Sequence, residues 1–86
     1  MESMNDRSRE VSIERSRTNI AHRAAPRFES EPDGSLIWDI EYMQNPADRY
    51  WGPRGRFTER DGKFYLGDHV FNSAYAAIRH KALIGD

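Results

Sequence analysis

Three histidines are the side chains best suited to acid–base or metal chemistry in this chain. His22 lies in an N-terminal segment with few large apolar residues, His69 in a short connector and His80 on a predicted helix. None is spaced with a second histidine or a carboxylate as zinc ligands usually are. Asp68, next to His69, would form an acid–base pair only beside a nucleophile. We therefore expect no metal site and no histidine-based catalysis.

The motifs of covalent and phosphate chemistry are missing from the sequence. There is no cysteine, which excludes disulfides and thiolate metal sites, and there is no Gly-x-Ser-x-Gly nucleophile elbow. The stretch GPRGRFTERDGKF has no glycine five residues before Gly62, and Lys63 is not followed by Ser or Thr, so it is not a phosphate-binding loop. A chain of 86 residues also leaves little room for a catalytic pocket. We expect a protein that is not an enzyme and needs no cofactor.

Two carboxylates, Asp39 and Glu41, fall on the same face of a predicted strand, about 7 Å apart. A catalytic carboxylate dyad is one interpretation of this spacing. The other is that both pair with basic residues on a neighbouring strand, which stabilises a sheet by up to about 1 kcal/mol per pair. The candidates for such pairing are Arg56, Arg60 and Lys63. We favour the structural pairing.

Charge is nearly balanced overall but unevenly distributed. Thirteen basic residues stand against fourteen acidic ones, for a net charge of −1. Residues 28–48 hold six acids and no Lys or Arg, whereas residues 49–63 hold five bases and two acids. The blocks could neutralise each other across a sheet, or they could complement a charged partner. A protein that mainly coats nucleic acid would usually carry a strong basic excess.

Arginine and aromatic residues are concentrated in a predicted loop that contains Gly52, Pro53 and Gly55. Arg, Tyr and Trp dominate the energetically important positions of protein interfaces. The predicted partner-binding residues are Arg49, Tyr50, Trp51, Arg54 and Arg56. No local carboxylate is expected to pair with both Arg54 and Arg56. The alternative is that Tyr50 and Trp51 turn inward and close the end of a small core.

The clearest structural signals are a strand and a hairpin. Residues 35–43, SLIWDIEYM, have Leu36, Trp38, Ile40 and Tyr42 on one face and Ile37, Asp39, Glu41 and Met43 on the other. Asp61-Gly62 predicts a tight turn between strands at residues 56–60 and 63–66. Residues 44–55 are expected to form a loop, and residues 67–71 a connector.

A C-terminal helix is expected to cover the sheet. Asn72 or Ser73 would cap it, and it would end near Leu83. Its predicted apolar stripe consists of Ala74, Tyr75, Ile78 and Ala82.

Residues 1–26 contain few large apolar residues and place like charges four apart, which predicts a flexible Arg-rich tail. A short strand at Val11 and Ile13 stays open as an alternative, because these residues alternate with polar ones. Pro26 is the expected boundary, and Arg27–Ser30 a short edge strand that a second copy could pair with to form a homodimer. We therefore expect an α+β domain over residues 27–86, in which a small antiparallel sheet of three or four strands packs on one C-terminal helix.

Residues near the end of the predicted sheet resemble two related DNA-binding modules, the arm-binding domain of phage integrases and the ethylene-response-factor-type domain of plants. The resemblance is carried by Phe64-Tyr65-Leu66-Gly67 and then Phe71, Ser73, Ala74 and Ala77. It implies a three-stranded sheet that docks in a DNA groove, with a helix packed behind it. Asp39 and Glu41 depart from this pattern, because they would face DNA phosphates. The resemblance is therefore used for topology only.

These observations favour a small regulatory or inhibitory protein that binds a larger protein partner, of the kind that phages and plasmids carry as accessory proteins. The alternative is a nucleic-acid-binding module that uses the basic hairpin, with contacts from Arg54, Arg56, Arg60 and Lys63. No apolar run approaches the roughly 20 residues that cross a bilayer, so we expect no membrane partner and a cytoplasmic location.

Overall fold

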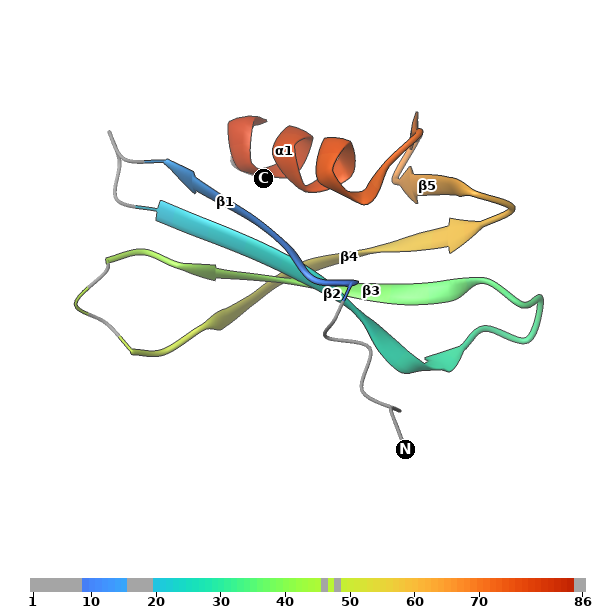
Figure 1. Ribbon diagram of the computed structural model, residues 1–86, viewed down its shortest axis with the longest axis horizontal. Coiled ribbons are helices and arrows are strands. Elements are labelled where there is room, and N and C mark those ends of the chain that lie inside the picture. Colours follow the sequence, from blue (N-terminus) through green and yellow to red (C-terminus); the bar gives the residue numbers. More distant parts are fainter. Residues whose placement is uncertain (1–8, 16–19, 46, 48, 85–86) are drawn as a thin grey trace.

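The computed structural model describes residues 9–15, 20–45, 47 and 49–84. In these residues six antiparallel strands form one sheet, in which each strand pairs with its neighbours in the chain (Figure 1). The elements are β1 (Val11–Arg15), β2 (Ile20–Ser30), β3 (Leu36–Met43), β4 (Gly52–Arg60), β5 (Lys63–Leu66), β6 (His69–Phe71) and α1 (Ala74–Ile84).

The predicted fold is wrong in its strand number and in leaving the N-terminal segment out of the sheet. The sheet has six strands rather than three or four, and β1 and β2 lie largely within residues 1–26. β2 continues through the expected boundary at Pro26, which is buried and pairs in register with Trp38. The alternative of a strand at Val11 and Ile13 is confirmed. The rest of the predicted tail, residues 1–8 and 16–19, lies outside the described residues.

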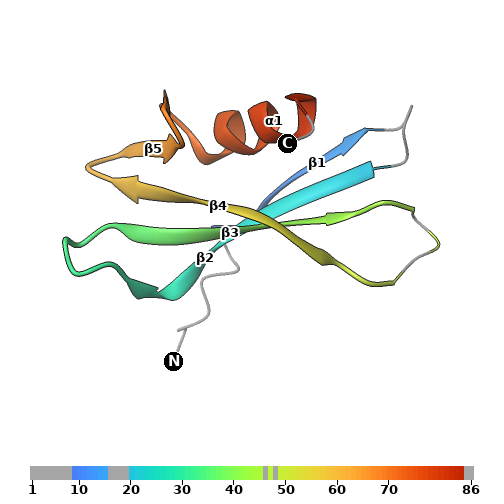
Figure 2. The ribbon, with the colours of Figure 1, turned by 180° about the vertical axis from the view of Figure 1, so that it is seen from behind.

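The sheet curls so strongly that α1 contacts both of its ends. The helix packs against β1 and β2 at one end and against β5 and β6 at the other, and the view from behind shows it lying above both (Figure 2). A curled sheet closed by a helix buries a core without a second sheet.

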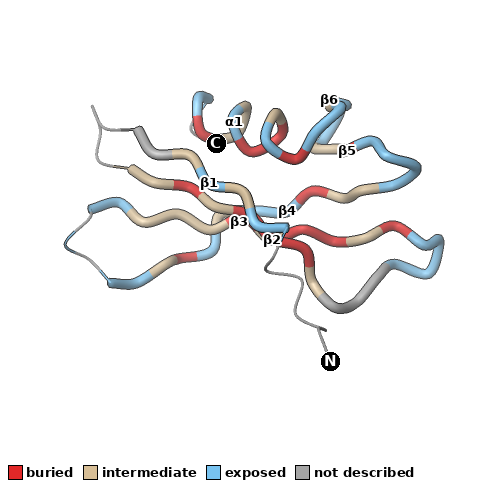
Figure 3. Tube along the Cα trace, in the orientation of Figure 1, coloured by how far each residue is buried: buried red, intermediate tan, exposed pale blue. Residues whose placement is uncertain are grey.

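The core is built on the strand that the sequence marks most clearly. Trp38 is 1% exposed, stacks on Phe57 with ring centres 5.3 Å apart, and meets the edge of Phe64 at 5.8 Å. Ile40 and Ile78 are the other large, fully buried side chains. The buried positions therefore follow the middle of the strands and one side of the helix (Figure 3).

The helix stripe differs from the prediction at one position. Ala74, Ile78 and Ala82 are buried as expected, but Tyr75 is 52% exposed and Ala77 takes its place against the sheet. Small alanines let the helix axis approach the curled strands, and a tyrosine at that contact would hold them apart.

Arg9 connects the N-terminal segment to the core. Its guanidinium lies 5.1 Å from the centre of the Trp38 ring and donates a 3.0 Å hydrogen bond to Glu59 Oε2. Trp38 Nε1 donates to the other oxygen of the same carboxylate, also at 3.0 Å. One carboxylate thus satisfies the buried indole N–H and holds the arginine over the ring.

Two local predictions are confirmed by the backbone. Asp61 and Gly62 both have positive φ, 54° and 78°, as a type I′ turn between β4 and β5 requires. Ser73 caps α1, because its Oγ accepts a 3.1 Å hydrogen bond from the Ala76 N–H.

Replacing Ser73 with alanine should lower the free energy of unfolding by about 1 kcal/mol, since the Ala76 N–H loses its capping acceptor. Urea denaturation followed by circular dichroism measures this loss. Ser12→Ala, at an exposed position on β1, is the matched control and should change stability by less than about 0.5 kcal/mol. Equal effects of the two substitutions would contradict the capping role.

Candidate functional site

We call the face of the sheet opposite α1 the outer face. Trp38 and Ile40 point toward the helix, so the residues that alternate with them on β3, Asp39 and Glu41, lie on the outer face. Register places Glu41 opposite Arg23 of β2, and Asp39 opposite Arg56 of β4. Acidic residues from β3 therefore lie between basic residues from both neighbouring strands.

Ion pairs cross the outer face in both directions from β3. Arg23 Nε donates a 2.7 Å hydrogen bond to Glu41 and also lies 3.6 Å from Glu10. Asp39 accepts a 3.0 Å hydrogen bond from Arg56 Nε and lies 3.7 Å from Arg27. The predicted pairing is confirmed for Asp39 with Arg56. Glu41 pairs instead with Arg23 of β2, which was not among the predicted partners.

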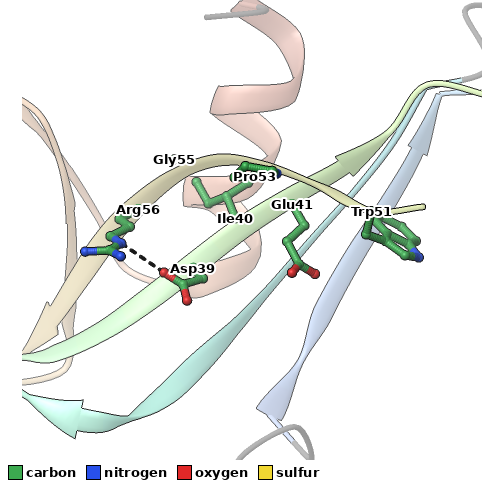
Figure 4. Close-up of a pocket in the computed structure, with 7 residues that line it drawn as sticks. All are labelled: Asp39, Ile40, Glu41, Trp51, Pro53, Gly55 and Arg56. Carbon is green, nitrogen blue, oxygen red and sulfur yellow. Dashed lines mark hydrogen bonds and ion pairs between the residues drawn. The ribbon is translucent and has the colours of Figure 1, made fainter.

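A hollow of about 500 Å³ opens on the outer face between β3 and β4. It is lined by Asp39, Ile40, Glu41, Trp51, Pro53, Gly55 and Arg56. Figure 4 shows the Asp39–Arg56 ion pair at one end of the hollow and the Trp51 indole at the other, with Ile40 and Pro53 between them. The hollow thus lies between an ion pair and an indole, with the exposed Pro53 ring between them, since the Ile40 side chain points toward α1.

Trp51 is held in place by Arg23, whose guanidinium lies 4.0 Å from the centre of the indole ring. A cation over an aromatic face at this distance contributes about 0.5–1 kcal/mol at a partly exposed site. Arg23 therefore contacts both the Trp51 ring and the Glu41 carboxylate. Sequence reasoning missed this residue because it falls in the segment that was expected to be a tail.

The predicted partner-binding residues are only partly brought together. Trp51 and Arg56 line the hollow, and Tyr50 lies beside Trp51 in the chain with 73% of its surface exposed. Arg49 is also exposed in the same loop. The alternative that Tyr50 turns inward is wrong. Asp39 pairs with Arg56 alone, while Arg54 lies against the Tyr42 ring, which agrees with the expectation that no one carboxylate pairs with both arginines.

Arg54 points to the other side of the sheet. The register between β3 and β4 shifts after Ile40, so that Arg54 is an extra residue between Gly55 and Pro53. A bulge of this kind re-aims the side chain that it adds. The Arg54 guanidinium lies 5.5 Å from the centre of the Tyr42 ring, and its buried Nε has no hydrogen-bond partner among the described residues.

The basic hairpin residues proposed to contact nucleic acid are engaged locally. Arg60 donates a 3.2 Å hydrogen bond to Asp33, and Lys63 donates one of 2.8 Å to Asn72. The Ser35 backbone N–H donates to Asp33 Oδ1 at 2.9 Å, and this bond, more than Arg60, holds the pKa of Asp33 below its usual value. Neither Arg60 nor Lys63 lines the hollow.

Two further features are absent from the described part of the chain. It contains no group of three or more histidine, cysteine or carboxylate side chains placed to hold a metal ion. It also contains no helix that is long and apolar enough to span a bilayer. The chain matches no family model, no curated protein and no solved structure.

The Arg23–Glu41 pair should show a coupling energy of about 1 kcal/mol in a double-mutant cycle, since both side chains are largely shielded from solvent. Unfolding of Arg23→Ala, Glu41→Ala and the double variant in urea gives this value. The Arg56–Asp39 pair is the matched control, because its side chains are 63% and 44% exposed and its coupling should stay below about 0.5 kcal/mol. A larger coupling for the exposed pair would contradict this assignment.

Proposed function

We propose that this chain is a non-enzymatic protein that binds a larger protein partner through its outer face and regulates or inhibits that partner. The observation that carries the proposal is the hollow between Trp51 and Arg56, on the face of the sheet opposite α1. A partly apolar hollow between an aromatic and an arginine side chain offers the contacts that dominate protein interfaces.

Exposure and pairing divide the residues around the hollow into two groups. Arg23 and Glu41 hold each other at 2.7 Å, so they form a rigid part of the surface. Arg56 is 63% exposed, so its side chain can reorient toward an incoming partner. A preformed surface with a few adaptable side chains reduces the ordering cost of binding.

The charge pattern supports a protein partner over nucleic acid. Carboxylates of Asp39 and Glu41 lie between the arginines of the outer face, where they would repel a phosphate backbone. A protein surface can present charges of both signs and match such a row through electrostatic complementarity. The proposal includes a cytoplasmic setting, because a cysteine-free domain needs no oxidising compartment in order to fold.

Affinity capture of proteins from a nuclease-treated lysate, with the tagged chain as bait, tests the proposal. We expect one protein to be retained by the parent chain and by Arg79→Ala, an exposed helix position, and to be lost from Trp51→Ala. In parallel, binding to random-sequence DNA is titrated at several salt concentrations. Tight DNA binding that falls steeply with salt, together with no variant-dependent protein capture, would favour the nucleic-acid alternative and overturn the proposal.

A further inference from the structure

Two histidines that are eleven positions apart in the chain meet in the folded protein. His69 lies on β6 and His80 on α1, and their ring centres are 4.5 Å apart with the ring planes at 50°. His80 is half-buried against β6, because the curl of the sheet brings this edge strand to the helix.

The Phe71 ring contacts both imidazoles. Its ring centre lies 5.3 Å from that of His80 and 6.2 Å from that of His69, and the same ring packs against the buried core. The strand and the helix that carry the histidines are therefore fixed relative to each other. Two donors on packed elements form a chelating pair at little further conformational cost.

The spacing of the rings can be compared with the geometry of metal ligation. An imidazole nitrogen binds a metal at about 2.0–2.1 Å, which places each ring centre about 3.2 Å from the ion. If each ring directs one nitrogen at a shared ion, ring centres 4.5 Å apart enclose an angle of about 90° at that ion. This is the angle between neighbouring ligands in tetragonal geometry, whereas a tetrahedral ion would separate the rings to about 5.2 Å.

We propose that His69 and His80 form a two-histidine chelate for a divalent transition metal with tetragonal preference, Cu²⁺ above all. Imidazole suits Cu²⁺, and first-row divalent ions bind a given nitrogen site most tightly as Cu²⁺. Water completes the coordination, since His69 is exposed to solvent. The site needs only the two protein donors, so it is compatible with the lack of three-ligand clusters in the described residues.

The test uses the full chain, with its amino terminus acetylated so that the terminal amine cannot bind copper. Cu²⁺ alone is titrated and followed by electron paramagnetic resonance and calorimetry. We expect one ion per chain, a tetragonal spectrum with coupling to two nitrogens, and a loss of affinity of about tenfold or more in His69→Gln and in His80→Gln. Arg79→Gln, next to His80, is the control and should bind like the parent.

Both glutamine variants are checked for parental melting temperatures in the absence of metal. If His80→Gln perturbs the helix packing, His69→Gln carries the test alone, because its side chain is on the exposed edge strand. The proposal is overturned if His69→Gln binds Cu²⁺ as tightly as the parent chain. A spectrum with coupling to one nitrogen in the parent would overturn it as well.

Discussion

Replacing Trp38 with alanine should lower the free energy of unfolding by about 3–5 kcal/mol. The indole is 1% exposed, stacks on Phe57 and contacts the edge of Phe64, so its removal leaves a cavity at the centre of the core. It also removes the indole N–H that donates to Glu59 and the ring that supports Arg9. Native domains are stable by roughly 5–15 kcal/mol, so this loss would remove a large share of the free energy of unfolding.

Urea denaturation followed by circular dichroism measures this change. Trp51→Ala is the matched control, because it removes the same side chain from the outer face rather than from the core, and it should cost about 1 kcal/mol or less. A Trp38→Ala variant that unfolds at the same urea concentration as the parent would show that the strand register is wrong.

The same Trp51→Ala substitution, and Arg56→Ala, should each weaken partner binding by about 2 kcal/mol or more. Trp51 forms one end of the hollow and Arg56 the other, so each deletion removes a contact that neighbouring side chains cannot replace. Arg56→Ala should change stability by less than about 1 kcal/mol, since its ion pair with Asp39 is exposed.

Calorimetric titration of the captured partner with each variant gives the affinity losses. Arg79→Ala should bind as the parent does, because Arg79 is exposed on the helix rather than on the outer face. Lost stability with unchanged affinity in both Trp51→Ala and Arg56→Ala would assign the hollow to the scaffold.

The sequence predicts β3, the β4–β5 hairpin and α1 because each carries a strong local signal. In the middle of β3, large apolar residues alternate with Asp39 and Glu41, so Trp38 and Ile40 could be placed on the buried face. Asp61-Gly62 specifies the turn through backbone conformations that few other dipeptides tolerate. Ser73 marks the start of the helix through its capping hydroxyl.

The N-terminal strands could not be predicted with the same certainty, because β2 is built from small residues. Ala24 and Ala25 are buried, yet alanine is depleted in strands and contributes little to an apolar pattern. Ala24 is buried because it packs into the core that α1 closes, which is a tertiary effect. Arg23 and Ala25 lie on the outer face, opposite Glu41 and Asp39 of β3, and this pairing is a tertiary effect as well.

A bulge in β4 places the predicted site residues on two faces of the sheet, and the alternation of residue types along the strand does not reveal this bulge. Arg54 and Arg56 are two residues apart and would share a face in a regular strand. The bulge after Ile40 directs Arg54 toward Tyr42, while Arg56 stays with Asp39 on the outer face. The prediction of an Arg/aromatic site thus named residues from both faces of β4.

Hydroxyl-radical footprinting of the free and the partner-bound chain tests the central claim most directly. Trp51 and Tyr75 form the informative pair, because Trp51 lines the hollow and Tyr75 is 52% exposed on the helix. If the outer face binds the partner, Trp51 should be protected in the complex while Tyr75 keeps its free oxidation rate. Protection of Tyr75 with unchanged oxidation of Trp51 would contradict the account and place the interface on the helix.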